Sequence, residues 1–349
     1  MIHAGCWFLR SGIQESSGGV ARYFRTDTNR NAAVSTEITG YAVSALAYLH
    51  SVSNPVSRGS EFLDAARRAA GYLTNDAWDE TSHTFPFEPG SPHAYFFDIG
   101  IIVRGLMAAW RATGDEVFRA RAKEASLSLA FDFMGDGCFH PVITLPEKQP
   151  LEHEPRWSRK PGCYQLKSAL AWLDDDQPQG RPLFNEVLSY SLATHESFLA
   201  DERDREKLMD RLHAYCYFLE ALLFVSEQDK AKQALRWGID RVAELLREIA
   251  PEFERSDVCA QLLRIRLAAH YSGVVALDES AAQEEATRAA SYQGHSPDPR
   301  SDGGYWFGRK RGEMLPFMNP VSTAFCMQAL EMWEQHRAGA RRFDIRELI

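Results

Sequence analysis

The chain has 349 residues, of which 45% are hydrophobic and 25% charged, a composition typical of globular proteins and not of disordered or fibrous ones. Its net charge of −9 excludes bulk attraction to nucleic acid or to an anionic membrane. The six cysteines are scattered without a CxxC pair, and no secretory signal or long uncharged apolar run is visible. We therefore expect a cytoplasmic protein with a single domain over residues 1–349.

Six segments along the chain are predicted to be helices rich in small and apolar residues, with few charges. They are Thr39–His50, Asp98–Arg111, Gly162–Leu173, Asp210–Val225, Ser256–Tyr271 and Ser322–Trp333. A helix that is apolar all round is expected to be central. The starts of these segments are roughly 40 to 65 residues apart, which is the spacing of a helix-pair repeat.

Amphipathic segments lie between the apolar ones and are predicted to be outer helices. Examples are Glu61–Leu73, Glu116–Phe131, Phe184–Ala193 and Lys230–Ile249. Each has one apolar face and one charged face, as a peripheral helix does. The N-terminal segment Ala4–Ile13 could supply the outer helix that pairs with the last inner one. The predicted fold is all-α: an (α/α)6 toroid of helical hairpins, with an open solenoid as the alternative.

The connections predict where a functional site lies. Those from an outer helix to the next inner one are long and rich in glycine, proline and aromatic residues: Trp78–Phe97, Gly135–Pro161 and Ser291–Val321. Only short strands are expected, at Gly19–Phe24 and Tyr305–Gly308. Helix N-termini present unpaired N–H groups and the positive end of the helix dipole. We therefore expect the site among these loops and the first turns of the inner helices.

Two of the loops resemble each other. Gly18-Gly19 is followed by Arg22 and Tyr23, and then by Val34-Ser35-Thr36 at a helix start. Gly303-Gly304 is followed by Tyr305 and Trp306, and then by Val321-Ser322-Thr323 at another. Paired glycines allow a close approach to a ligand, and Tyr23, Tyr305 and Trp306 offer flat faces on which sugars could stack. The alternative is a repeated glycine turn followed by a helix cap.

Acidic residues stand at the starts of inner helices. Glu37 and Asp98 occupy the first turns of the first two, and Tyr41 lies on the same face as Glu37. Two carboxylates that flank one bond can act as acid and base, or acid and nucleophile. Asp257 starts the fifth inner helix and His213 the fourth. The alternatives are an acid that stabilises a helix N-terminus and a structural histidine.

Two further features concern charge and metal. Arg309, within the basic run Arg309–Arg311, could bind a uronate or a phosphate, or it could belong to a solvated loop. The pair Asp257 and Cys259 is similar to zinc ligands of protein prenyltransferases, but no histidine stands where that family's third ligand would be. We therefore expect neither a metal nor a cofactor.

The segments Ser16–Phe24 (SSGGVARYF) and Ser35–Leu49 (STEITGYAVSALAYL) resemble the six-hairpin α/α-toroid carbohydrate-active superfamilies. D-glucuronyl C5-epimerase C-terminal domains and unsaturated-glucuronyl hydrolase-like proteins are the most similar in character. For a hydrolase, the resemblance implies Glu37 and Asp98 as acidic catalysts. For an epimerase or lyase it implies proton transfer by tyrosine and carboxylate, with candidates at Tyr23, Tyr41, Tyr95 and Tyr164.

The predicted function is that of a carbohydrate-active enzyme, either a hydrolase or a lyase/epimerase. Its substrate would be an oligosaccharide or a uronic-acid-containing molecule, and no nucleic-acid or membrane partner is expected. Glu37, Asp98 and Tyr41 are the catalytic candidates. The substrate-binding candidates are Arg22, Tyr23, Tyr95, Tyr164, His213, Asp257, Tyr305, Trp306 and Arg309. The alternatives are a terpenoid-cyclase- or prenyltransferase-like toroid and a non-catalytic sugar-binding module.

Overall fold

The computed structural model describes residues 1–53, 58–174, 178–200, 202–340 and 343–349. Contacts between residues divide the chain into two compact units. Unit 1 comprises residues 1–11, 23–31 and 195–349, and unit 2 comprises residues 12–22 and 32–194. The expectation of a single domain over the whole chain stays a prediction. None of the described helices is both long and apolar enough to cross a membrane.

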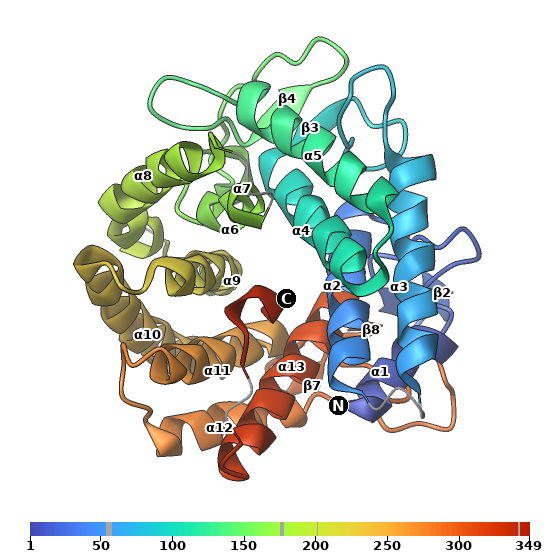
Figure 1. Cartoon of the computed structure of the whole chain (residues 1–349). Helices are drawn as coiled ribbons and strands as arrows, with labels where there is room; N and C mark the ends of the chain where they lie inside the picture. Colours follow the sequence, from blue (N-terminus) through green and yellow to red (C-terminus); the bar gives the residue numbers. More distant parts are fainter. Residues whose placement is uncertain (54–57, 175–177, 201, 341–342) are drawn as a thin grey trace. The chain divides into compact units, whose positions relative to one another are not determined.

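Unit 2 contains inner helices that are almost wholly buried and outer helices with one buried face. The inner ones are α2 (Thr36–Val52), α4 (Phe96–Thr113) and the short pair α6 (Gln165–Ala169) and α7 (Ala171–Asp174). The outer ones are α3 (Ser60–Tyr72), which continues into the π-helical turn η2 (Leu73–Ala77), α5 (Glu116–Phe131) and α8 (Gly180–Ala200), whose last residues belong to unit 1. Helix α2 packs against α3 and α4 against α5, so the predicted alternation is confirmed here (Figure 1).

Glycines let the inner helices of unit 2 approach one another closely. A Cβ atom on Gly105 of α4 would lie 2.5 Å from the carbonyl oxygen of Gly40 on α2. A Cβ atom on Gly40 would lie 3.0 Å from the Cα atom of Ile102. A Cβ atom on Gly100 of α4 would lie 2.4 Å from the Cβ atom of Ser168 on α6. The backbones are therefore in direct contact, and the first turns of α2 and α4 lie next to each other.

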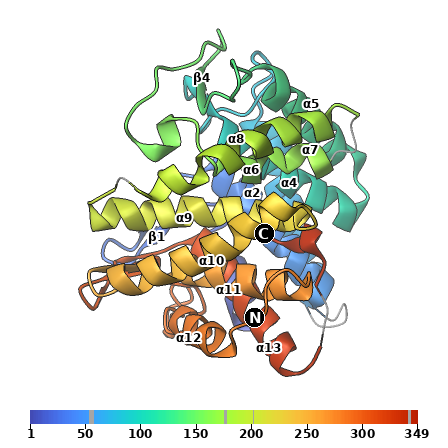
Figure 2. The ribbon, with the colours of Figure 1, turned by 90° about the vertical axis from the view of Figure 1, so that its left-hand side faces the viewer.

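Unit 1 repeats the pattern. Its inner helices are α9 (Arg205–Leu222), which runs into the 3-10 turn η4 (Leu223–Val225), α11 (Ser256–Tyr271) and α13 (Pro320–Arg337). Its outer helices are α10 (Asp229–Ile249), α12 (Glu279–Ala290) and α1 (Ile2–Arg10). Figure 2 shows α9, α10 and α11 side by side, and α11 packs against both α12 and α13. The contact of α1 with α13 confirms the predicted pairing of the N-terminal helix with the last inner one.

Short antiparallel strands precede the inner helices. In unit 2, β3 (His93–Tyr95) pairs with β4 (Val142–Thr144) and leads directly into α4. In unit 1, β5 (Phe253–Arg255), β6 (Gly308–Lys310) and β7 (Glu313–Met314) form one sheet, and β1 (Phe24–Arg25), β2 (Arg30–Asn31) and β8 (Phe317–Met318) form another. The two predicted strands are only partly present, because Val20, Ala21, Tyr305 and Trp306 make isolated bridges.

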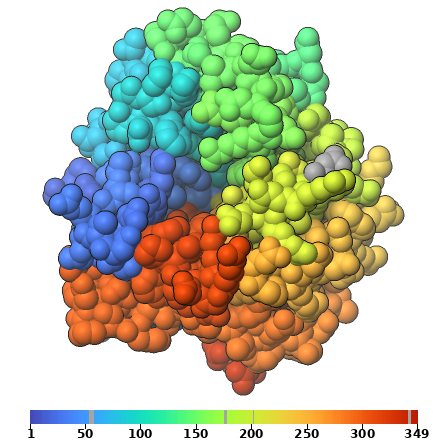
Figure 3. All heavy atoms as spheres, turned by 180° about the vertical axis from the view of Figure 1, so that it is seen from behind, coloured from blue at the N-terminus to red at the C-terminus, as the bar shows by residue number. Residues whose placement is uncertain are grey.

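The long connections lie over the helix starts, as predicted. Thr36 Oγ1, in the first turn of α2, donates to the carbonyl oxygen of Phe87 (2.9 Å). Ser256 Oγ, in the first turn of α11, donates to the carbonyl oxygen of Trp306 (2.6 Å). The segment 135–161, which includes the 3-10 turn η3 (Trp157–Arg159), lies on the surface of unit 2 and is green in Figure 3.

Candidate functional site

The first glycine loop positions Arg22 above the start of α2. Gly18 adopts φ +95° and lies against the carbonyl oxygen of Arg68, where any side chain would clash. The chain then turns back, and the backbone N–H of Val20 donates to Thr39 Oγ1 (2.9 Å). The backbone of Arg22 is held in place by its N–H, which donates to the carbonyl oxygen of Ala33 (3.0 Å).

The second glycine loop has the same hydrogen bonds but a different register from the one predicted. The N–H of Tyr305 donates to Thr323 Oγ1 (2.9 Å), as that of Val20 does to Thr39. The N-cap residues are Ser35 for α2 and Asn319 for α13. The predicted alignment of the two Val-Ser-Thr triplets is therefore wrong: Ser35 corresponds to Asn319 and not to Ser322. Because Val321 then corresponds to Glu37, the second loop leads to a helix start without an acid.

Glu37 and Asp98 form a pair of acids at the starts of α2 and α4. Asp98 is 7% exposed, and its Oδ2 atom has no hydrogen-bond partner among the described residues. Glu37 keeps some contact with solvent. Loss of water raises the pKa of Glu37 to about 7, and Arg22 opposes that rise. The pKa of Asp98 is raised well above its usual value by burial and by the charge of Glu37, again against Arg22.

This arrangement can donate and accept protons at neutral pH. Two interacting carboxyl groups do not both ionise easily, so burial and the charge of Glu37 favour the protonated form of Asp98, while Glu37, with a pKa of about 7, exchanges protons near neutral pH. A group that titrates near the working pH is the best acid or base. Burial also raises the pKa of Glu285 in unit 1 to about 7. However, both oxygens of Glu285 accept hydrogen bonds from Arg266 (2.8 and 3.0 Å), which marks a structural ion pair.

Aromatic and cationic groups lie beside the acids. The Arg22 guanidinium carbon lies 4.7 Å from the centre of the Phe87 ring, and Phe87 packs on Tyr95 at 5.2 Å. Arg159 lies 5.5 Å from the centre of the Tyr95 ring. Burial raises the pKa of Tyr95. The site therefore combines two acids, a partly exposed aromatic wall and arginine charges.

Phe87 and Arg159 were not among the predicted site residues. Phe87 belongs to an aromatic and acidic loop that the sequence shows, but no periodicity tells which of its rings faces the acids. Other rings of the same loop turn away: Trp78 and Phe85 are buried and pack on each other at 5.0 Å. The direction in which a ring of this loop points depends on contacts of the loop backbone, such as the hydrogen bond from Thr36 Oγ1 to the carbonyl oxygen of Phe87.

Tyr41 and Tyr164 are buried in the same unit. Tyr41 lies one turn after Glu37 on α2 and is 2% exposed. Tyr164 precedes α6, and its hydroxyl donates to the carbonyl oxygen of Lys160 (3.2 Å) while its ring packs edge-on against Trp157 at 5.0 Å. Burial raises the pKa of Tyr164 strongly, so it stays a neutral phenol. These contacts favour a supporting role for Tyr164.

A second polar cluster lies among the inner helices of unit 1. His213 Nδ1 bonds to Gln261 Oε1 (2.8 Å), and the hydroxyl of Tyr217 bonds to His213 Nε2 (2.9 Å). Burial and the charge of Arg255 lower the pKa of His213 to about 4, so the imidazole is neutral. Because α9 begins at Arg205, His213 lies in its third turn, and the prediction that it starts the helix is wrong. Asp204, as the N-cap, places the helix start further upstream.

Asp257 is held by arginine. Both of its carboxylate oxygens accept hydrogen bonds from Arg255 (3.0 and 2.6 Å), which also binds Asp210 (2.8 Å). The charge of Arg255 lowers the pKa of Asp257 against the effect of burial. Burial raises the pKa of Cys259 well above its usual value. The pair therefore lacks the free anionic ligands that zinc requires.

The remaining candidates also belong to unit 1. Tyr305 is buried, which favours a packing role, whereas Trp306 is partly exposed. Tyr23 packs on Phe317 at 5.3 Å. Arg309 lies 5.1 Å from the centre of the Tyr292 ring. Of the predicted residues, unit 2 thus contains Arg22, Glu37, Asp98, Tyr41, Tyr95 and Tyr164, and unit 1 contains Tyr23, His213, Asp257, Tyr305, Trp306 and Arg309.

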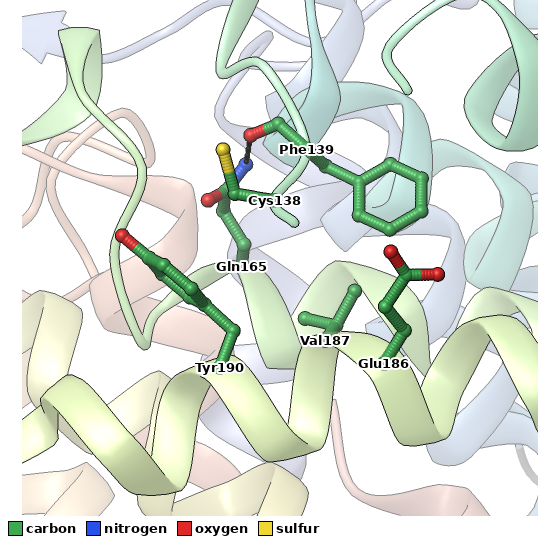
Figure 4. A pocket seen from close by; sticks show the side chains of 6 residues that line it. All are labelled: Cys138, Phe139, Gln165, Glu186, Val187 and Tyr190. Carbon is green, nitrogen blue, oxygen red and sulfur yellow. Dashed lines mark hydrogen bonds between the residues drawn. The ribbon is translucent and has the colours of Figure 1, made fainter. Parts of the chain in front are cut away.

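A small hollow in unit 2 is separate from the acids. Its wall is formed by a loop, the start of α6 and one face of α8 (Figure 4), and comprises Cys138, Phe139, Gln165, Glu186, Val187 and Tyr190. Gln165 Nε2 donates to the carbonyl oxygen of Phe139 (2.9 Å) and closes its floor. With a volume of about 10 Å³, it holds at most roughly one water molecule. It is too small for a sugar.

Comparison with known proteins identifies the fold. No protein-family model matches the sequence, and no curated protein matches it by sequence. Among solved structures, cellobiose 2-epimerase from Spirochaeta thermophila is 14% identical, with a TM-score of 0.68 over 96% of this chain and 94% of that one. An unsaturated glucuronyl hydrolase specific for heparin is 10% identical, with a TM-score of 0.66 over 97% and 96%.

An α-mannanase of glycoside hydrolase family 76 from Bacteroides thetaiotaomicron is 12% identical, with a TM-score of 0.61 over 96% of this chain and 97% of that one. All three are α/α-toroid carbohydrate-active enzymes. The predicted resemblance is therefore confirmed at the level of the fold, and an unsaturated glucuronyl hydrolase is among the similar structures.

Proposed function

We propose that this protein is a carbohydrate-active enzyme in which Glu37 and Asp98 transfer protons to and from a sugar substrate. The observation that carries the proposal is the pair of interacting acids at the starts of α2 and α4, of which Asp98 is buried and Glu37 is partly exposed, both with raised pKa values. Acids with strongly shifted pKa values that interact with each other are typical of functional sites. The similar structures are enzymes of sugar chemistry, which supports this substrate class.

Each group has a distinct role in the proposal. Burial and the charge of Glu37 raise the pKa of Asp98 and so favour its protonated form, which suits the general acid. Glu37 ionises near pH 7 and is the general base. Such a pair serves hydrolysis, where acid and base flank a glycosidic bond. It equally serves elimination or epimerisation, where one group removes a proton from carbon and the other supports the neighbouring oxygen.

Arg22 and the aromatic wall define the substrate-binding part of the site. Phe87 and Tyr95 provide partly exposed faces for a sugar ring, and Arg22 and Arg159 lie against those faces. A guanidinium group binds a carboxylate through two parallel hydrogen bonds. The substrate class that fits best is an oligosaccharide that carries a uronic acid.

We also infer that the chain forms a closed (α/α)6 toroid. Support comes from the pairing of inner and outer helices within each unit and from the α/α-toroid fold of the similar structures. The pairing of α1 with α13 joins the first helix of the chain to its last inner helix.

A substrate panel with three variants tests the function. Purified protein is incubated with cellobiose, α-mannan oligosaccharides and an unsaturated heparin disaccharide, and products are followed by NMR in D2O and by reducing-end release. We expect turnover of the unsaturated heparin disaccharide, the uronate-containing member of the panel, and a loss of at least about 100-fold in kcat for Glu37→Gln and for Asp98→Asn, as expected when general acid–base catalysis is removed. Glu61→Gln is the matched control, because Glu61 is an exposed acid in the first turn of outer helix α3.

Full activity of the Glu37→Gln protein would overturn the proposal. So would sugar binding without turnover by the wild-type protein on every class of the panel, because that result would indicate a binding module. An equal loss of activity in Glu61→Gln would show that the effect is not specific to the pair.

A further inference from the structure

The loop that follows α12 is closed at its base by backbone hydrogen bonds. The N–H of Gly294 donates to the carbonyl oxygen of Gly304 (2.8 Å), and the N–H of Gly303 donates to that of Gly294 (2.9 Å). Gly303 has φ +89°, which glycine adopts without strain. His295 and Asp302 are the first and last residues inside this base, so the backbone holds them beside each other.

Helix α1 contributes a third polar side chain at the same place. A Cβ atom on Gly303 would lie 2.5 Å from the carbonyl oxygen of His3, so the loop and the helix are in backbone contact. The indole N–H of Trp7 donates to the carbonyl oxygen of Arg300 (2.8 Å) and fixes the helix to the loop. The side chain of His3 then reaches Asp302, with 2.9 Å between Nε2 and Oδ2.

The three side chains are close enough to share one metal ion after small adjustments. One ligand atom from each of His3, His295 and Asp302 lies within 4.8 Å of the other two. A zinc ion at 2.0–2.2 Å from each would bring these atoms to roughly 3.3–3.5 Å from one another. The two imidazoles are exposed, so small rotations suffice. Asp302 is oriented by the N–H of Ser296 (3.3 Å), as metal ligands commonly are by outer partners.

We propose that His3, His295 and Asp302 bind a zinc ion that fastens α1 to the loop after α12. Two imidazoles and one carboxylate suit zinc among the common divalent ions, and three protein ligands leave one position for water. His295 belongs to the same group, since its ring lies 5.8 Å from that of His3 and its charge acts on Asp302. The proposal departs from the expectation of no metal, because residues 299 positions apart in the sequence give no spacing signal.

Zinc titration of the protein without a polyhistidine tag tests the site. Calorimetry with ZnCl2 should show one equivalent bound to the wild-type protein, with a rise in Tm because the ion binds only the folded state. His295→Ala keeps the bond from His3 to Asp302 and should weaken zinc binding at least about tenfold. The control is His83→Ala, since His83 is an exposed histidine of unit 2.

Cobalt(II) provides a readout that does not depend on stability. The wild-type protein should develop visible absorption bands of a four-coordinate cobalt site, and His295→Ala should not. Equal zinc affinity in the wild-type and His295→Ala proteins would overturn the proposal. An equal weakening by His83→Ala would also overturn it. None of these measurements uses turnover, so their outcome does not depend on whether the proposed function is correct.

Discussion

Arg22 is the residue that adjusts the acid pair. Its positive charge stabilises the ionised form of Glu37 and of Asp98, and so lowers both pKa values against the effect of burial. Its guanidinium also packs on Phe87, 4.7 Å from the ring centre. One side chain thus links the aromatic wall to the two acids whose pKa values are raised.

Replacing Arg22 is expected to move the pH–activity profile upward. Activity that needs ionised Glu37 rises with pH through the pKa of that residue, which is about 7. Without the arginine charge, that pKa rises further, so Arg22→Gln should shift the rising limb of kcat to higher pH, by on the order of one unit. Arg22→Lys keeps the charge and is the control. If the rising limb of kcat lay at the same pH in Arg22→Gln as in the wild-type protein, the proposed effect of Arg22 would be contradicted.

The helices α2 and α4 act as a single element because glycines sit at their contact. Gly40 and Gly105 allow backbone contact between the two helices. Glu37 lies about one turn before Gly40 and Asp98 about two turns before Gly105, so the distance between the helices also sets the distance between the acids. Any side chain at this contact must push the two helices apart. The electrostatic interaction between Glu37 and Asp98 therefore depends on residues that carry no charge.

A single added methyl group tests this dependence. Gly105→Ala should destabilise the fold by about 1–3 kcal/mol through overpacking and should reduce activity, because its Cβ would lie 2.5 Å from the carbonyl oxygen of Gly40. Gly71→Ala in α3 is the matched control, since its Cβ would meet nothing closer than 4.0 Å. Alanine is the better helix former there and should stabilise slightly. Denaturant unfolding measures both, and equal effects would contradict the packing argument.

The periodic spacing of apolar residues predicted those helices whose buried face follows from their own sequence. Helix α5 has the predicted bounds, Glu116–Phe131, and α3 has one buried and one exposed face, as predicted for an outer helix. Periodicity failed where polar residues form the first turn, as in α9. It also gave one helix where the chain breaks at Leu170 into α6 and α7, and it did not identify α12, which is short and rich in alanine and charge.

At the scale of the whole molecule, the sequence indicated two acids at helix starts but not the side chains that lie beside them. Glu37 and Asp98 were identified from their place at helix starts, which is a local signal. Phe87 and Arg159 join them through long loops whose path depends on tertiary hydrogen bonds. The division into two units, each with segments distant in sequence, likewise has no counterpart in composition or repeat spacing.

The central claim is that Glu37 and Asp98 titrate as an interacting pair, and carboxyl 13C NMR across pH tests it most directly. In the wild-type protein, Glu37 should titrate near pH 7, and Asp98 should titrate well above the usual range of an aspartate. Glu37→Gln should remove the first transition and move that of Asp98 to lower pH, because a negative neighbour is lost. The transition of Glu285, also near 7, should persist unchanged. Ordinary acidic pKa values for both residues, or an Asp98 transition that ignores Glu37→Gln, would contradict the account.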